Sequence, residues 1–185
     1  LLTALVLAAC TADSPSPPQM MTPSVAEGAL PLNARRLEII ENWKMPIEPP
    51  YIGHLQQAYP GNLVSQWATR TLVPAGGSGE LILDITRAAV TKVKLPREVG
   101  LTNALTDQQD AEIKVEFEAQ LMWLQPVGGS QAMIKLVASH AVTIPESSSA
   151  NDVQRAVNEC LNAALEGLDR QARVELDKLD NVILP

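Results

Sequence analysis

The sequence predicts an α+β domain, a two-layer sandwich in which two helices lie on one face of a mostly antiparallel sheet of about four strands. Three observations support this prediction: alternation of apolar and polar residues over 112–124 and 131–144, a glycine pair between these segments, and a long amphipathic segment over 153–179. A period of two residues is typical of strands with one solvent-facing side, and a period of about 3.6 is typical of helices. The expected order of elements is β-α-β-β-β-α.

The first half of the domain is expected to contain one strand and one short helix. The strand covers residues 35–43, whose apolar residues mostly share one parity. Residues 45–61 are rich in proline and are expected to form a loop. The helix should begin at an N-cap, Asn62, and end before Pro74. Its inward-facing residues recur at helical spacing: Leu63, Val64, Trp67, Ala68, Thr71 and Leu72.

The middle of the chain is expected to form a turn followed by a long strand. Residues 74–79 are rich in glycine and precede a strand that begins at Glu80. The alternation of this strand slips by one residue near Ala88–Val90, which indicates a bulge or a bend. The polar segment 95–110 is expected to be a crossover loop.

The clearest prediction is a β-hairpin. Apolar residues face one way over 112–124 and again over 131–144, with polar residues facing the other way. Gly128 and Gly129 lie between these strands and tolerate the positive φ angles that a tight turn requires. Pro145 is expected to end the second strand.

A long helix is expected from a capping box formed by Ser149 and Asp152 to about Lys178. Its apolar stripe is predicted to pack on the sheet. The stripe consists of Val153, Val157, Cys160, Leu161, Ala164, Leu165, Leu168, Ala172, Leu176 and Leu179. The charged residues of this helix, Asp169 among them, are predicted to lie mostly on the solvated side.

The first residues indicate an export signal. Residues 1–9, LLTALVLAA, are uncharged, too few to span a membrane, and similar to the apolar region of a signal peptide. Leu7-Ala8-Ala9-Cys10 resembles a bacterial lipobox, in which the cysteine thiol receives a diacylglycerol before cleavage. This makes Cys10 the predicted lipidation site and first mature residue, with palmitate among the expected acyl groups. The alternative is a buried cysteine in an apolar helix.

This interpretation divides the chain into three parts. Residues 1–9 are a signal peptide remnant, residues 10–32 are the lipidated cysteine with a proline-rich tether, and residues 33–185 are a single domain. Thr11 follows the cysteine, and by resemblance to enterobacterial lipoproteins it favours the outer membrane over the inner one. The expected location is the cell envelope, anchored by lipid and facing the periplasm.

Composition argues against several functional classes. The 185 residues include 14 Lys and Arg against 21 Asp and Glu, a net charge of −7. Such a chain is a poor partner for nucleic-acid phosphates. Two histidines and two cysteines leave little material for a zinc site or a histidine-based triad. We therefore expect no catalytic residue, no metal, no cofactor and no nucleic-acid partner.

For several single residues, a structural role is a simpler explanation than a functional one. His54 and His140 are far apart in the sequence, and His140 falls in the apolar register of a strand. Cys160 is expected to be a small buried hydrophobe. The glycine run 76–79 precedes a strand, so a turn is expected instead of a phosphate-binding loop. The tryptophans fall on apolar phases and are expected to be core residues instead of a ligand cage: Trp43, Trp67 and Trp123.

The proline-rich loop over 46–60 is the candidate contact surface. Tyr51, Ile52, Leu55 and Tyr59 place aromatic and apolar side chains in a segment that is expected to be exposed, which favours contact with a partner. The alternative is that the loop simply lies over the edge of the sheet.

The lipobox, the proline-rich tether and the order of elements together resemble the auxiliary lipoproteins of ABC-type lipid transport systems, the PqiC-like family. The resemblance covers residues 35–180, with a first strand, a tryptophan-bearing helix, three strands and a long helix rich in alanine and leucine. The architecture is also similar to that of the lipoproteins of lipopolysaccharide export, and the chain is similar to uncharacterised lipoproteins of alphaproteobacteria. The resemblance implies a subunit of an envelope transport or assembly complex.

The leading hypothesis is therefore a non-enzymatic, membrane-anchored lipoprotein that serves as an accessory or binding subunit. Two alternatives stay open. A periplasmic carrier of lipid or another small molecule would need a pocket between sheet and helix, and an envelope hydrolase would need a cluster of carboxylates around His140.

Overall fold

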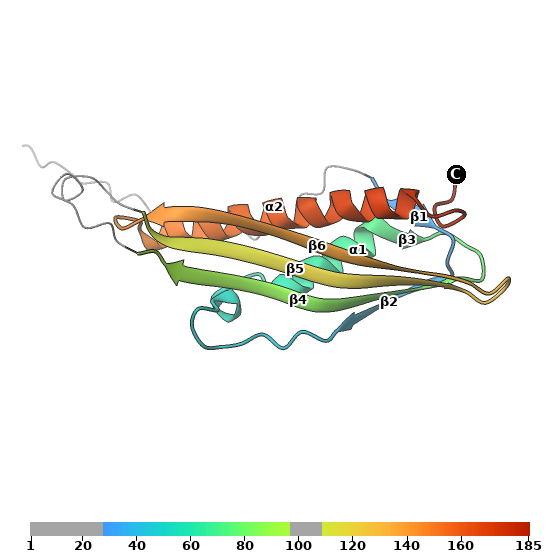
Figure 1. Cartoon of the computed structure of the whole chain (residues 1–185), viewed down its shortest axis with the longest axis horizontal. Coiled ribbons are helices and arrows are strands. Elements are labelled where there is room, and N and C mark those ends of the chain that lie inside the picture. Colours follow the sequence, from blue (N-terminus) through green and yellow to red (C-terminus); the bar gives the residue numbers. More distant parts are fainter. Residues whose placement is uncertain (1–27, 97–108) are drawn as a thin grey trace, which may run out of the picture.

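The computed structural model describes residues 28–96 and 109–185 and shows an α+β fold, which confirms the predicted class (Figure 1). The elements are β1 (Leu30–Leu32), β2 (Arg36–Glu41), the short 3₁₀ helix η1 (Gly53–Leu55), α1 (Pro60–Thr71), β3 (Leu72–Pro74), β4 (Glu80–Lys94), β5 (Gln109–Gln125), β6 (Ser130–Pro145) and α2 (Ala150–Asp177).

Four strands form the main sheet in the order β2-β4-β5-β6. β2 runs parallel to β4, whereas β4, β5 and β6 form an antiparallel meander. Along β5, every second residue from Ala111 to Trp123 is buried, and the residues between them are partly exposed. One sheet face therefore packs against α1 and α2, and the other face meets solvent.

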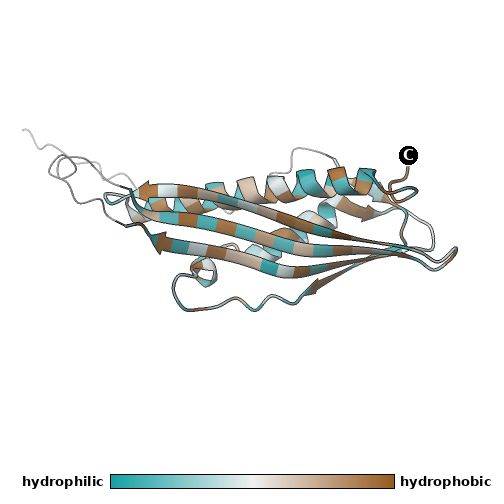
Figure 2. Ribbon diagram, in the orientation of Figure 1, coloured by the Kyte–Doolittle hydropathy of each residue, from teal (hydrophilic) through white to brown (hydrophobic). Residues whose placement is uncertain are grey.

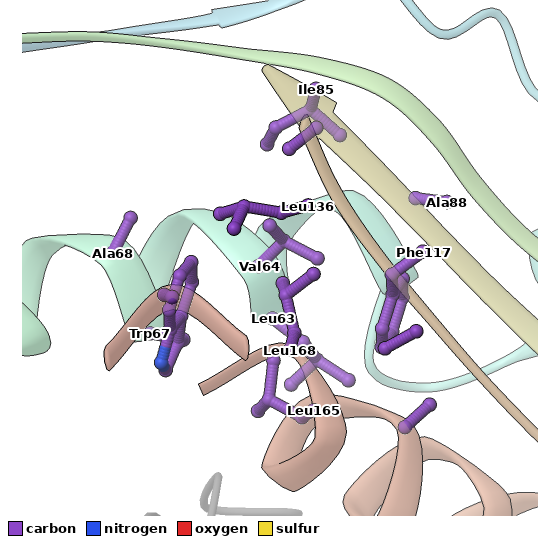
Figure 3. Packing of buried hydrophobic residues seen from close by; sticks show 14 of the residues in the cluster. Leu63, Val64, Trp67, Ala68, Ile85, Ala88, Phe117, Leu136, Leu165 and Leu168 are labelled. Carbon is purple, nitrogen blue, oxygen red and sulfur yellow. The ribbon is translucent and has the colours of Figure 1, made fainter. Parts of the chain in front are cut away.

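The space between sheet and helices is filled by apolar side chains. Figure 3 shows Leu63, Val64 and Trp67 of α1 next to Leu165 and Leu168 of α2. The side chains of β4, β5 and β6 close this layer from the sheet side, and Trp67 is 0% exposed. Burial of this apolar surface is the main stabilising term of the fold.

The predicted hairpin is confirmed, with β5 and β6 slightly longer than expected. Gly128 and Gly129 have φ angles of 95° and 70°, so glycine is needed at both turn positions. The capping box is confirmed as well: Asp152 N donates to Ser149 Oγ, and Ser149 N donates to a carboxylate oxygen of Asp152.

Two local predictions are wrong by a few residues. Helix α1 begins at Pro60 instead of after an Asn62 N-cap, because proline in the first turn has no amide hydrogen to leave unsatisfied. The irregularity of β4 lies between Ile85 and Arg87 instead of at Ala88–Val90. Arg87 stays on the solvent side in this way, while the residues before and after the bulge are buried.

A small parallel sheet of β1 and β3 was not expected from the sequence. Leu30 pairs with Leu72, and Leu32 is 0% exposed. Leu184 N donates to Pro31 O, so the chain near residue 184 covers the other side of β1. β1 therefore lies within the last residues of the segment 10–32 that the sequence assigns to the tether.

Asp169 is the clearest departure from the sequence-based expectation for α2. It was predicted to lie on the solvated side, yet it is only 4% exposed. Trp67 Nε1 donates to Asp169 Oδ1 at 2.8 Å, and Arg173 Nε donates to Asp169 Oδ2 at 2.8 Å. Arg173 Nη2 also donates to Gly28 O at 2.7 Å. The buried carboxylate is thus paired and hydrogen-bonded, as burial of a charge requires.

Candidate functional site

The loop between β2 and α1 runs along the edge of β4. β2 ends at Glu41, far short of the end of β4, and the loop then takes its place. Ile52 N donates to Val90 O at 2.9 Å, and Lys92 N donates to Pro50 O at 2.9 Å. The loop therefore satisfies the backbone of an edge that would otherwise be open to another chain. This matches the alternative in which the loop lies over the sheet edge.

The four predicted contact residues differ in the solvent exposure of their side chains. Tyr51 and Tyr59 are half-buried, and Ile52 packs against the core. Leu55 is 69% exposed. Ile47, which sequence reasoning did not select, is 75% exposed on the same loop. Leu55 and Ile47 are the large apolar side chains of this loop that are exposed, and we call the two together the loop patch.

A group of aromatic and charged side chains fixes the inner side of this loop. The rings of Trp43 and Tyr51 lie 6.4 Å apart at 53°, and the guanidinium of Arg87 lies 5.2 Å from the centre of the Trp43 ring. Arg87 Nη2 and Lys114 Nζ each bind one oxygen of Glu116 at 2.9 Å. Hydrogen bonds from Lys114 and Arg87 hold the pKa of Glu116 below its usual value.

The prediction that the tryptophans are core residues is confirmed: Trp67 is 0% exposed and Trp123 is 6% exposed in one core, and Trp43 packs against it. Trp123 Nε1 also donates to Asn33 O at 2.8 Å near the β5–β6 turn. Trp43 is half-buried beside Arg87, and its Nε1 has no hydrogen-bond partner among the described residues.

The other candidate residues are on different elements. His140 is half-buried on β6 opposite Val115, whereas His54 is exposed in η1. Cys160 is buried, as predicted, and burial raises the pKa of its thiol to about 11. Within residues 28–96 and 109–185, no three His, Cys, Asp or Glu side chains are grouped as a metal site requires. The glycine run 76–79 is a turn before β4, as predicted.

One shallow hollow of about 370 Å³ lies on the outer side of α1. It is lined by Ser65, Gln66, Thr69 and Arg70. Three of these side chains already donate to backbone carbonyls one turn earlier in the same helix. The hollow is therefore a feature of the helix surface, and it lies outside the layer between sheet and helices that a carrier would use.

The predicted lipidation residue, Cys10, lies outside the described residues, as do Thr11 and most of the tether. Among the helices in the described part of the chain, none has the length and apolar character needed to cross a bilayer. The lipidation prediction therefore stands on the sequence alone.

No protein-family model matches the chain, and neither does any curated protein. Among solved structures, it is similar to a protein from Helicobacter pylori described as a neuraminyllactose-binding hemagglutinin homologue, at 14% identity and a TM-score of 0.45, covering 84% of this chain and 90% of that chain. It is also similar to the rare lipoprotein B of Shewanella oneidensis, at 13% identity and a TM-score of 0.39. This match covers 76% of this chain and 96% of that chain. A minor lipoprotein of Acinetobacter baumannii is similar at 10% identity and a TM-score of 0.41. This match covers 84% of this chain and 100% of that chain.

Bacterial lipoproteins are thus among the solved structures to which this chain is similar. Identities of 10–14% and TM-scores below 0.5 assign neither a family nor a function.

Proposed function

We propose that this chain is a non-enzymatic lipoprotein of the bacterial cell envelope, and that it serves as an accessory or binding subunit of a lipid transport or assembly machine. The observation that carries the proposal is the apolar stretch of residues 1–9, which ends in the lipobox-like motif Leu7-Ala8-Ala9-Cys10 and is followed by a proline-rich segment. The chain faces the periplasm, and Thr11 favours the outer membrane. The PqiC-like resemblance supplies the class of machine.

The structure supports a binding role through the loop patch. Ile47 and Leu55 are both largely exposed, although the loop that bears them is held in place by backbone hydrogen bonds to β4 and by the aromatic group around Trp43. Exposed apolar side chains on a fixed segment are typical of a protein-binding surface, because little conformational entropy is lost when they are covered. The filled layer between sheet and helices does not favour the alternative of a carrier with an internal pocket.

The variant Cys10→Ser tests the anchor. A serine hydroxyl cannot take the thioether-linked diacylglycerol, so we expect the exported protein to move from the membrane fraction to the soluble periplasmic fraction. Immunoblotting of fractionated cells gives the measurement. Cys160→Ala is the matched control, because Cys160 is buried in the domain and its removal should leave the protein in the membrane. Retention of the Cys10→Ser protein in the membrane would refute the anchor.

The double variant Ile47→Asp, Leu55→Asp tests the binding role. Chemical crosslinking in native membranes followed by affinity purification should recover a subunit of an envelope machine with the unchanged chain, and about tenfold less with the double variant. Val174→Asp is the matched control, since Val174 is 56% exposed on α2, away from the loop. If no envelope-machine subunit is recovered with the unchanged chain, the accessory role is wrong. Equal recovery with the double variant would exclude the loop patch as the contact surface.

A further inference from the structure

Three segments from distant parts of the sequence meet at one end of the molecule. They are residues 75–79, residues 124–133 around the β5–β6 turn, and residues 181–185, and we call them together the hairpin end. β1 and the residue after it join them. Ala75 N donates to Leu32 O at 2.9 Å, Asn33 N donates to Val182 O at 2.8 Å, and Trp123 Nε1 donates to Asn33 O at 2.8 Å. Figure 1 shows the β5–β6 turn projecting beyond the other elements at this end.

The hairpin end carries no charged side chain, although charged residues make up 19% of the chain. It also has some of the most exposed large apolar side chains among the described residues. Val127 is 73% exposed, Met133 is 69% exposed, and Leu124 is 36% exposed. Figure 2 shows apolar residues along the parts of β5 and β6 that lead into the turn. Large apolar side chains that are exposed on an uncharged, projecting end are costly in water.

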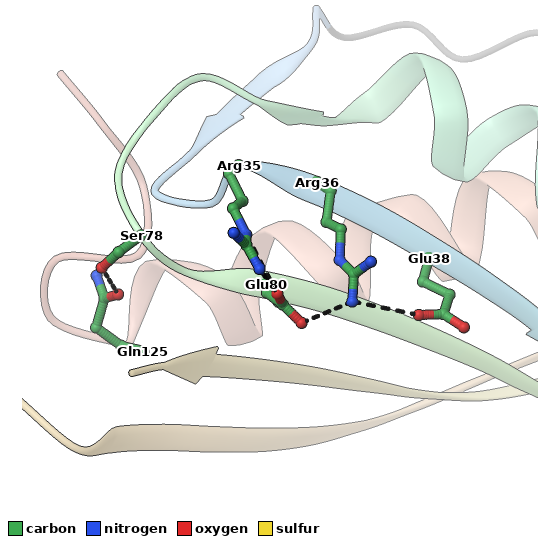
Figure 4. A network of polar contacts seen from close by, with 6 residues as sticks. All are labelled: Arg35, Arg36, Glu38, Ser78, Glu80 and Gln125. Atoms are coloured by element: carbon green, nitrogen blue, oxygen red, sulfur yellow. Dashed lines mark hydrogen bonds and ion pairs between the residues drawn. The ribbon is translucent and has the colours of Figure 1, made fainter. Parts of the chain in front are cut away.

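Charged side chains lie at the base of the hairpin end. Arg35 and Arg36 both pair with Glu80, and the Arg36–Glu80 distance is 2.9 Å (Figure 4). Next to them, Ser78 Oγ donates to Gln125 Oε1 at 2.5 Å, which ties the turn before β4 to the base of the hairpin. The side chains of Arg35 and Arg36 are more than half exposed, so they can reach phosphate groups at the level where the apolar surface ends.

The segment that leads back to Cys10 enters the fold at the same end. Gly28 is bonded to Arg173 of α2, and the chain then passes through β1 to Asn33, next to the hairpin base. Residues 11–27 lie between Cys10, the predicted anchor, and Gly28, and such a length of chain spans about 60 Å at most. A membrane that holds Cys10 is therefore within reach of the hairpin end.

We propose that the hairpin end contacts the lipid surface of the membrane in which the chain is anchored, with Val127, Met133 and Leu124 in the interfacial region and Arg35 and Arg36 at the level of the lipid phosphates. This inference rests on the proposed function, because it takes Cys10 as the anchor. A lipid surface fits better than a protein partner for two reasons. The β5–β6 turn projects beyond the other elements (Figure 1), and the backbone groups of the hairpin up to the turn are bonded within it, as an apolar environment requires.

Site-specific fluorescence tests the inference in the acylated full chain. Val127→Cys and, as a matched control, Val174→Cys are labelled with an environment-sensitive fluorophore. Acylation occupies Cys10, and burial protects Cys160 from the label. The protein is reconstituted into vesicles of phosphatidylethanolamine and phosphatidylglycerol that contain a spin-labelled quencher lipid. We expect blue-shifted emission at position 127 and quenching about threefold stronger than at position 174.

Flotation of the vesicles separates the two proposals. If the chain floats with the vesicles but the probes at 127 and 174 are quenched equally, the hairpin end does not contact lipid, and a protein partner is the remaining explanation for the apolar surface. If the chain does not float, the anchor has failed, and the same vesicles are added to the unanchored protein. A shift at position 127 alone then supports the lipid contact, and no shift overturns it.

Discussion

Replacing Trp67 by alanine is expected to lower the free energy of unfolding by about 3–5 kcal/mol. The indole is 0% exposed and lies between α1 and α2, so its removal leaves a cavity that the surrounding leucines can close only in part. The variant also removes the hydrogen bond to Asp169, a carboxylate that is itself only 4% exposed. Urea denaturation followed by circular dichroism gives the measurement, with an unchanged slope as the sign that the unfolding reaction is the same.

A pair of phenylalanine variants separates the hydrogen bond from the ring. Trp67→Phe keeps most of the aromatic volume and removes the Nε1 donor, so we expect a loss of about 1–3 kcal/mol. Trp43→Phe makes the same chemical change at a half-buried indole whose Nε1 has no partner among the described residues, and it should cost less. Equal losses for the two variants would show that the bond between Trp67 and Asp169 adds no stability beyond ring packing.

The parts of the fold that the sequence predicted well are long and periodic. β5 and β6 alternate over many residues, and a shift of one position would expose a whole apolar face, so only one register is acceptable. The glycine pair fixes the turn between them, and the capping box fixes the start of α2. Each of these signals is local, which is why it can be recognised without the tertiary structure.

The predictions that failed concern residues whose environment is created by distant parts of the chain. β1 and β3 are three residues each, too short for any alternation, and they exist because they pair with each other. Asp169 is a charged residue of the kind that usually lies on the solvated side of a helix. Trp67, far away in the sequence, donates a hydrogen bond to its carboxylate. Local pattern carries no information about such a partner.

The position of the candidate site in the sequence could be predicted, but the path of its loop and the exposure of its side chains could not. Proline content marked residues 46–60 as an irregular segment, and its aromatic and apolar side chains marked it as unusual. The path of the loop along β4 depends on the bridge between Tyr51 and Thr91, which no sequence pattern encodes. That path decides which side chains of the loop are exposed. The sequence therefore predicted Leu55 as a contact residue but gave no sign that Leu55 is more exposed than the half-buried Tyr51, and it did not indicate Ile47.

Replacing Gly79 by valine is expected to lower the free energy of unfolding by about 1–3 kcal/mol. A Cβ atom at this position would lie 2.4 Å from Asn33 O and 2.9 Å from Trp123 Nε1. The φ angle of Gly79 is outside the left-handed region, so glycine is needed here for space and not for backbone freedom. The nearest obstacle is a backbone oxygen, which cannot move without displacing β1 and the hydrogen bond that Trp123 donates to it.

The control for Gly79→Val is Ala75→Val in the same turn, where the side chain is exposed and the change should stay within about 0.5 kcal/mol. Because Asn33 joins β1 to the base of the hairpin, Gly79→Val should also loosen this end before the rest of the domain unfolds. Hydrogen exchange would then rise first in β1 and in the residues next to the β5–β6 turn. Uniform loss of protection across β4, β5 and β6 would show instead that the close approach at Gly79 supports the whole sheet, and that the hairpin end is not a separately ordered part of the molecule.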